Sequence, residues 1–338
     1  MLKRIRNTIV PWSQIAKRFD KADLLLGNGF SLNIEGHFNY VSLFKEFINS
    51  CNRTDGEVFK SFNTNNFELI LEKLSNALFV NKAFDIEYSQ IDVAIDQLKT
   101  GLITAIKDNH PRNNQLDKDQ LKRIAIQLKD FNDIFTLNYD LFLYHIIMLV
   151  LDESKKPKSK VKAYSDYFWG SYNSDFKKFE DHQDYEYKLL YYLHGALFIF
   201  TESYEIILKL IRGDVNTELI GQIEDAIQKD MIPLFVTEGL PEEKLQAINQ
   251  SKYLQFALSN LKNSNNKLVI FGCSLSSSDD HIVKAIKNNK RDLAISIHTK
   301  DKTENQLIRT QQFYEDKFPE SNVDFFDSDT LFHFRNHN

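Results

Sequence analysis

The stretch Asp23-Leu24-Leu25-Leu26-Gly27-Asn28-Gly29-Phe30-Ser31 decides the fold, because it joins a short apolar run to a glycine-rich turn. Short apolar runs bounded by turn residues are typical of the buried central strands of parallel sheets. A helix is expected to begin at the turn, where the glycines let the backbone approach a phosphate group. The stretch therefore predicts an α/β fold with a candidate phosphate-binding loop at residues 27–31.

The same pattern recurs along the chain. Further buried strands are predicted at residues 133–136, 189–193, 233–237, 267–271, 292–298 and 322–326. Apolar residues at helical spacing predict helices around residues 67–78, 91–106, 219–227 and 254–261. This alternation predicts a Rossmann-like, doubly wound and mostly parallel sheet. Residues 40–130 show helical patterns without a convincing strand, so we expect a helical insertion within one domain spanning residues 1–338.

The composition is that of a globular protein without specialised features. The apolar fraction is 42% and the charged fraction 26%, and a net charge of −5 gives no reason to expect nucleic-acid binding. No apolar stretch is long enough to span a bilayer, and the first residues lack the apolar core of a signal peptide. Two cysteines, Cys51 and Cys273, are too few for a disulfide framework or a cysteine-built zinc site. We expect a cytoplasmic protein with no metal and no membrane contact.

Three more motifs follow predicted strands: Thr-Leu-Asn-Tyr-Asp at residues 136–140, His-Gly at 194–195 and Gly-Cys-Ser-Leu at 272–275. Ligands of open α/β sheets bind at the carboxyl edge of the strands, so we expect the motifs to gather there as a nucleotide site. Asn138 suits either a helix cap or a group that orients a ribose hydroxyl or a water. His194 is either a buried core histidine or a general base, since its ordinary pKa of about 6.5 suits proton transfer near neutrality.

Two other enzyme classes fit less well. The first glycine turn is not a full dinucleotide fingerprint, because Leu32 stands where the third glycine belongs, which disfavours hydride transfer. The run from Gly272 to Ser276 is similar to the nucleophile elbow of an α/β-hydrolase, with Ser274 as nucleophile. Ser276 replaces the closing glycine of that motif, and only His281 and His298 follow as candidate histidines. The serine hydrolase therefore remains a distant alternative.

Taken together, the four motifs resemble the sirtuin-like NAD-binding fold, in particular bacterial sirtuin-like proteins that lack the zinc module. The resemblance extends from about residue 23 to residue 297 and includes residues 234–239 and 268–280. It implies Asn138 and His194 as catalytic residues, with Asp140 near the nicotinamide. It also implies a cofactor-binding set on the phosphates, the two riboses and the adenine side: Gly27, Asn28, Gly29, Phe30, Ser31, Gly272, Ser274 and Leu275.

The departures from that fold narrow the expected activity. The chain lacks the two Cys-x-x-Cys pairs and the peptide-clamping strand of protein deacylases. Zinc-free relatives resemble NAD-cleaving effectors of bacterial anti-phage systems, including the Thoeris effector, which act as oligomers, some with a sensor or ATPase partner. The resemblance thus implies an NAD hydrolase that releases nicotinamide and ADP-ribose, working as a homo-oligomer. The main alternative is a non-catalytic module that binds NAD or an ADP-ribose-type ligand.

Overall fold

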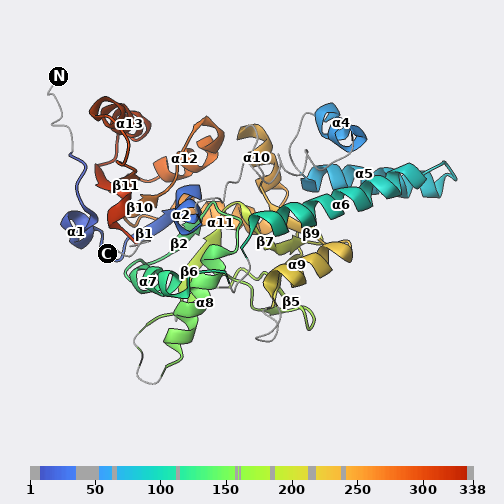
Figure 1. Ribbon diagram of the computed structural model, residues 1–338, viewed down its shortest axis with the longest axis horizontal. Helices are drawn as coiled ribbons and strands as arrows, with labels where there is room; N and C mark the ends of the chain where they lie inside the picture. The colour runs from blue at the N-terminus through green and yellow to red at the C-terminus, as the bar shows by residue number, and fades with distance from the viewer. Residues whose placement is uncertain are drawn as a thin grey trace.

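The computed structural model describes residues 8–35, 53–62, 67–111, 115–156, 159, 161–182, 187–211, 218–236 and 241–332. Its main layer is a seven-stranded sheet with the order β12-β11-β10-β1-β2-β6-β3, in which every pair of neighbours is parallel (Figure 1). The strands are β1 (Asp23–Leu26), β2 (Ile134–Thr136), β3 (Tyr164–Ser165), β6 (Lys188–Tyr192), β10 (Leu268–Phe271), β11 (Leu293–Ile297) and β12 (Val323–Asp327). The predicted Rossmann-like α/β fold is confirmed.

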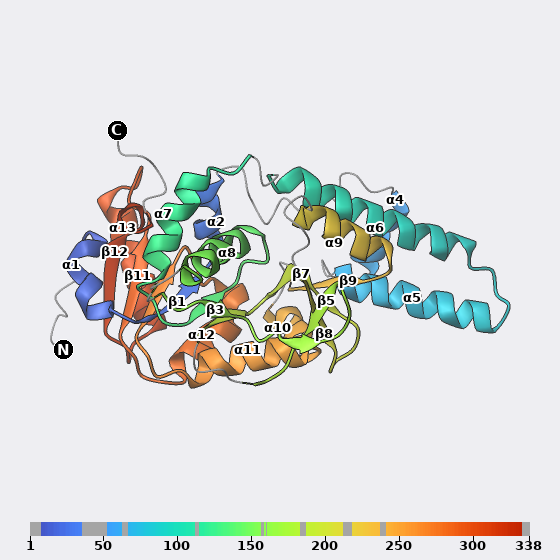
Figure 2. The ribbon, with the colours of Figure 1, turned by 90° about the horizontal axis from the view of Figure 1, so that it is seen from below.

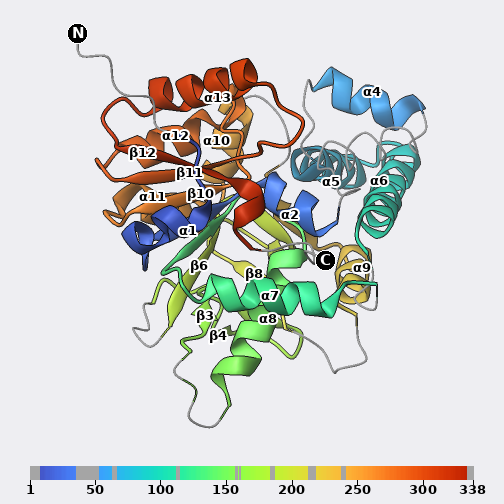
Figure 3. The ribbon, with the colours of Figure 1, turned by 60° about the vertical axis from the view of Figure 1, so that its left-hand side comes forward.

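Helices cover both faces of this sheet. The α-helices of the described residues are α1 (Trp12–Ile15), α2 (Asn28–Ile34), α4 (Arg53–Ser61), α5 (Phe67–Ala83), α6 (Ser89–Asn109), α7 (Lys118–Leu128), α8 (Phe142–Ser154), α9 (Leu219–Gln228), α10 (Pro241–Asn249), α11 (Lys252–Asn263), α12 (Asp280–Lys287) and α13 (Glu304–Lys317). Figures 2 and 3 show α7 and α8 on one face and α11 and α12 on the other. Because both faces are covered, every residue of β1 and β10 is buried, which explains their continuous apolar runs.

The strand order reverses at β1, and this reversal creates the edge where the motifs meet. From β1 the chain continues to β2 on one side, whereas β10 lies on the other side. The register pairs Leu26 with both Thr136 and Phe271, and Thr136 with Tyr192. The loops that follow these four residues therefore leave the sheet side by side at a topological switch point, the usual place for a ligand in such folds.

A second, antiparallel sheet is built from strands that lie before and after β6 in the chain, and it was not predicted from the sequence. Its order is β4-β5-β8-β7-β9, with β4 (Gly170–Ser171), β5 (Phe176–Lys178), β7 (Gly195–Thr201), β8 (Ile207–Leu210) and β9 (Ile232–Phe235). The assignment of residues 233–237 to the parallel sheet is wrong, because β9 pairs antiparallel with β7. Pro233 has no N–H to donate, which suits a strand at the sheet edge. Thr237 lies outside the described residues.

The described part of residues 40–130 is built from α4, α5, α6 and α7 and contains no strand. Helices α5 and α6 form a hairpin that projects from the body of the protein (Figure 2). The side of α6 contacts α9, where Lys107 forms an ion pair with Glu224 at 2.7 Å. None of the helices in the described ranges is long and apolar enough to cross a membrane.

Candidate functional site

The two glycine turns interlock at the carboxyl edge of β1 and β10. The N–H of Gly29 donates to the carbonyl of Gly272 at 2.8 Å. A Cβ on Gly29 would lie 2.7 Å from the Cα of Gly272, closer than atoms of this kind approach. Gly272 itself has a φ of +68°, and a Cβ there would lie 2.6 Å from the backbone nitrogen of Phe30. Glycine is therefore required at both positions by the close contact of the two turns.

Four predicted site residues from two motifs form one buried hydrogen-bond network. The side-chain amide of Asn138 donates to the carbonyl of Gly27 at 3.0 Å and to the hydroxyl oxygen of Ser31 at 2.9 Å. The Ser31 hydroxyl donates in turn to Oδ2 of Asp140 at 2.5 Å. Oδ1 of Asp140 accepts the N–H of Phe142, where α8 begins, at 2.8 Å. The structure thus ties the predicted phosphate loop to the Asn138 motif.

This network rules out the interpretation of Asn138 as a helix cap and leaves its side-chain oxygen available for a ligand. Asn138 does not cap α8, because Leu141 occupies the N-cap position and the Asp140 carboxylate accepts the helix N–H. Oδ1 of Asn138 and Oδ1 of Asn28 are buried and have no hydrogen-bond partner. A buried oxygen without a donor costs about 1–3 kcal/mol, so such atoms in a native protein usually mark a missing partner. Both oxygens suit a ligand that carries hydroxyl groups.

His194 emerges from β6 beside this network and is 5% exposed. The next residue, Gly195, has a φ of +71°, and a Cβ there would lie 2.0 Å from the carbonyl oxygen of Leu234. Glycine therefore lets the chain reverse directly into β7. Within the described residues no hydrogen bond connects His194 to Asn138, although the N–H of Leu193 donates to the carbonyl of Thr136 at 2.9 Å. The two motifs are adjacent, but no hydrogen bond between their functional side chains is formed in the described part of the chain.

His194 contacts a second histidine instead. Its Nε2 lies 2.9 Å from Nε2 of His281 in the first turn of α12, and the two rings are stacked with centroids 5.2 Å apart. Burial, followed by the nearby His281 and Lys244, lowers the pKa of His194 well below its ordinary value. Burial likewise lowers the pKa of His281 to about 4. Both imidazoles are therefore neutral near pH 7.

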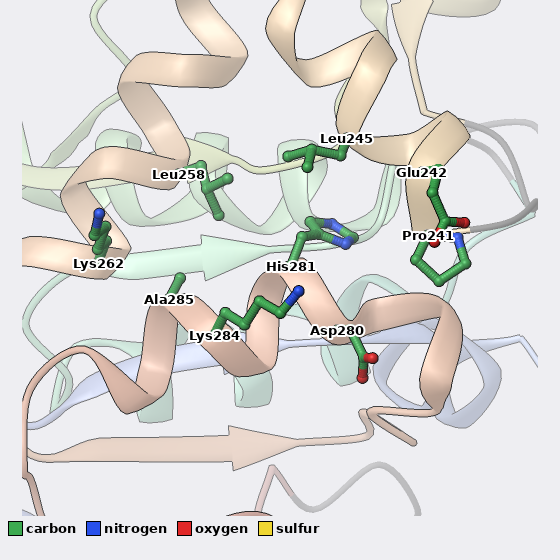
Figure 4. Close-up of a pocket in the computed structure, with 9 residues that line it drawn as sticks. All are labelled: Pro241, Glu242, Leu245, Leu258, Lys262, Asp280, His281, Lys284 and Ala285. Atoms are coloured by element: carbon green, nitrogen blue, oxygen red, sulfur yellow. The ribbon is translucent and has the colours of Figure 1, made fainter.

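His281 also lines a pocket of about 340 Å³ between α10, α11 and α12. Figure 4 shows its ring extending from α12 toward Leu245 of α10. Lys244, 4% exposed, forms an ion pair at 3.0 Å with Asp279, which precedes α12. Sequence reasoning considered His281 only as a hydrolase histidine, and no local pattern marked it as a partner of His194. A larger pocket of about 770 Å³ is lined by residues of α5 and the antiparallel sheet and by none of the predicted site residues.

The second glycine turn gives the hydrolase alternative no support. Ser274 is exposed, and no histidine in the described ranges forms a hydrogen bond with its hydroxyl. His281 contacts His194, whereas His298 lies near Ser328. Leu275 is buried with a φ of +46°, so it anchors the turn.

The family model described as "Domain of unknown function (DUF4917)" matches residues 24–332, which include both sheets and all four motifs. The chain belongs to this family. Comparison with the curated proteins finds no match. The description of the DUF4917 family assigns no activity, so the function of this member has to be argued from the geometry of its site.

Proposed function

We propose that the protein is an NAD hydrolase that cleaves the bond between nicotinamide and ribose. The observation that carries the proposal is the buried Oδ1 of Asn138, which lacks a donor while the amide nitrogen of the same side chain is held by Gly27 and Ser31. The amide cannot turn without losing both bonds, so its oxygen stays aimed at one place at the switch point of the sheet. A ribose hydroxyl or a water is the kind of donor that this oxygen needs.

Cleavage of the nicotinamide–ribose bond requires little from the protein beyond holding the ribose and a water in position. Nicotinamide leaves as a neutral molecule while positive charge develops on the ribose, so the leaving group needs no proton. The protein has to hold the sugar and present a water to the anomeric carbon. In the proposal Asn138 orients the ribose hydroxyls or that water. The carboxylate of Asp140, which accepts two hydrogen bonds, favours the cationic transition state electrostatically.

His194 is the proposed general base. A base near neutral pH has to be uncharged and to carry a lone pair, and the lowered pKa of His194 keeps it neutral. The glycine loop with Asn28, Phe30 and Ser31 would hold the phosphates and the nicotinamide-side ribose. The turn with Gly272, Ser274 and Leu275 would serve the adenine side.

The resemblance to anti-phage effectors adds a cellular role to the proposal. The protein then depletes NAD in a defence response in the cytoplasm, as a homo-oligomer and under the control of a sensor or ATPase partner. Control of this kind is needed because constant NAD hydrolysis would harm the host.

A module that binds NAD without cleaving it is the second candidate. It is favoured by the contact of His194 with His281, which occupies the ring nitrogen that a base would use. In that case Asn138 and His194 only bind the ligand.

Chromatography of NAD incubated with the purified protein separates the two candidates. Wild type is expected to release nicotinamide and ADP-ribose, and Asn138→Ala and His194→Ala to lose at least about 100-fold in rate, as for other positioned acid–base groups. His298→Ala is the matched control, because this histidine side chain is 51% exposed and contacts Ser328 and Asp329, which belong to none of the four motifs. Wild-type rates in a folded His194→Ala protein would overturn its assignment. Intact NAD with saturable binding would establish the binding module.

A further inference from the structure

The hydrogen-bond partners of His194 determine which of its ring nitrogens carries the proton. Its Nε2 faces His281, so the hydrogen bond to the carbonyl of Leu137 belongs to the other nitrogen, Nδ1. A carbonyl can only accept, and a neutral imidazole has one N–H. The proton of His194 is therefore on Nδ1, and its lone pair is on Nε2.

The direction of the bond between the two histidines follows from this. His194 accepts at Nε2, so His281 donates its Nε2–H across the 2.9 Å contact. The Nδ1 of His281 then carries a lone pair, and this atom is buried without a partner. Both ring nitrogens of His194 are occupied, and the lone pair that a base needs faces the N–H of His281.

We propose that His281 is the positioning residue of His194: its Nε2–H donates to the Nε2 lone pair of His194 and keeps the ring oriented until a substrate hydroxyl replaces that N–H. This role in catalysis rests on the proposed NAD hydrolysis, whereas the direction of the bond does not. On substrate binding the His281 ring turns toward the pocket between α10, α11 and α12, which offers about 340 Å³ of space beside it (Figure 4). His281 itself does not touch the reacting atoms.

The charged groups around the pair keep it neutral. Lys244 of α10 disfavours a proton on either ring, as does Lys284 on His281 from within α12. Asp279 and Asp280, at the start of α12, act in the opposite direction on His281, but burial outweighs them. Lys244 forms an ion pair with Asp279, so the opposite effects of these two charges on the pKa of His281 offset each other.

Nuclear magnetic resonance of the full chain labelled with ¹⁵N-histidine tests the bond directly. Wild type is expected to show the proton of His194 on Nδ1 at pH 7. His281→Phe keeps a planar ring but removes the N–H, so His194 should keep its proton on Nδ1, next to the Leu137 carbonyl, and titrate at a higher pH. His281→Gln keeps a donor and should restore the wild-type pattern. A wild-type His194 protonated on Nε2, or an unchanged titration of His194 in His281→Phe, would overturn the inference.

NAD cleavage measured from pH 5 to pH 9 tests the positioning role. In His281→Phe, kcat at pH 7 should fall roughly tenfold, the equivalent of about one hydrogen bond, while KM changes little. The acid limb should move to higher pH, and His281→Gln should recover most of the rate. Thermal melting by circular dichroism establishes that each variant is folded. If wild type cleaves no NAD, the proposed function fails, whereas the spectra still decide the bond between the histidines.

Discussion

Replacement of Gly272 by alanine is expected to destabilise the fold at the contact of the two glycine turns. The φ of +68° costs an L-residue about 1–2 kcal/mol. The added Cβ would lie 2.6 Å from the nitrogen of Phe30 and 2.8 Å from the Cα of Gly29. These are backbone atoms that cannot rotate away, and overpacking of this kind adds about 1–3 kcal/mol. We expect the free energy of unfolding to fall by about 2–5 kcal/mol.

Urea unfolding followed by circular dichroism measures this change, and Gly221→Ala is the matched control. Gly221 lies inside α9, and a Cβ there meets no atom within 4 Å. The same chemical change should therefore stabilise the helix by about 0.5–1 kcal/mol. A Gly272→Ala protein within about 0.5 kcal/mol of wild type, at an unchanged denaturant slope, would refute the argument that backbone contact requires glycine here.

Two further predictions concern charged groups away from the glycine turns. Burial raises the pKa of Asp133 to about 6, above the value of about 3.9 in an unfolded chain, so the folded state binds this proton more tightly. The protonated Asp133 therefore stabilises the fold below pH 4, and about 3 kcal/mol of this stability is lost as the pH rises to 6. Asp133→Asn should remove this pH dependence from the midpoints of urea unfolding. The same pH dependence in the variant would contradict the prediction. Lys244→Met leaves the Asp279 carboxylate, 13% exposed, without its partner and should cost about 3–5 kcal/mol, which the double variant with Asp279→Leu should largely restore. Equal losses in the single and double variants would show that the ion pair does not cause the effect.

The parallel sheet and the meeting of its motifs at one edge were predictable because both depend on local sequence. Buried strands such as β1 and β10 are apolar throughout, since helices cover both faces. Parallel strands end at one edge, so polar residues directly after them are brought together wherever they lie in the chain. This is why the motifs of Ser31 and Asn138, 107 positions apart, meet at one edge, although the hydrogen bond between the two side chains was not predicted.

The antiparallel sheet was missed for equally physical reasons. Strands of two or three residues, such as β4 and β5, are too short to show alternation. The seven residues of β7 follow His194 directly, and the positive φ of Gly195 turns the chain where the sequence indicated only the end of a strand. Pairing with β9 then depends on a partner more than thirty residues further on.

The sequence by itself determined the α/β class, six of the seven strands of the main sheet and the set of polar residues at its edge; the two-residue β3 was missed. Apolar patterning indicates which residues are buried. Parallel strands end at the same edge of the sheet, so the polar residues that follow them are brought together. Only the tertiary structure decided what each polar atom touches. His194 and His281 are separated by 87 positions and meet because α11 packs against both α12 and β6 in three dimensions. A hydrogen bond depends on distances of a few tenths of an ångström, and no local pattern in the chain encodes them.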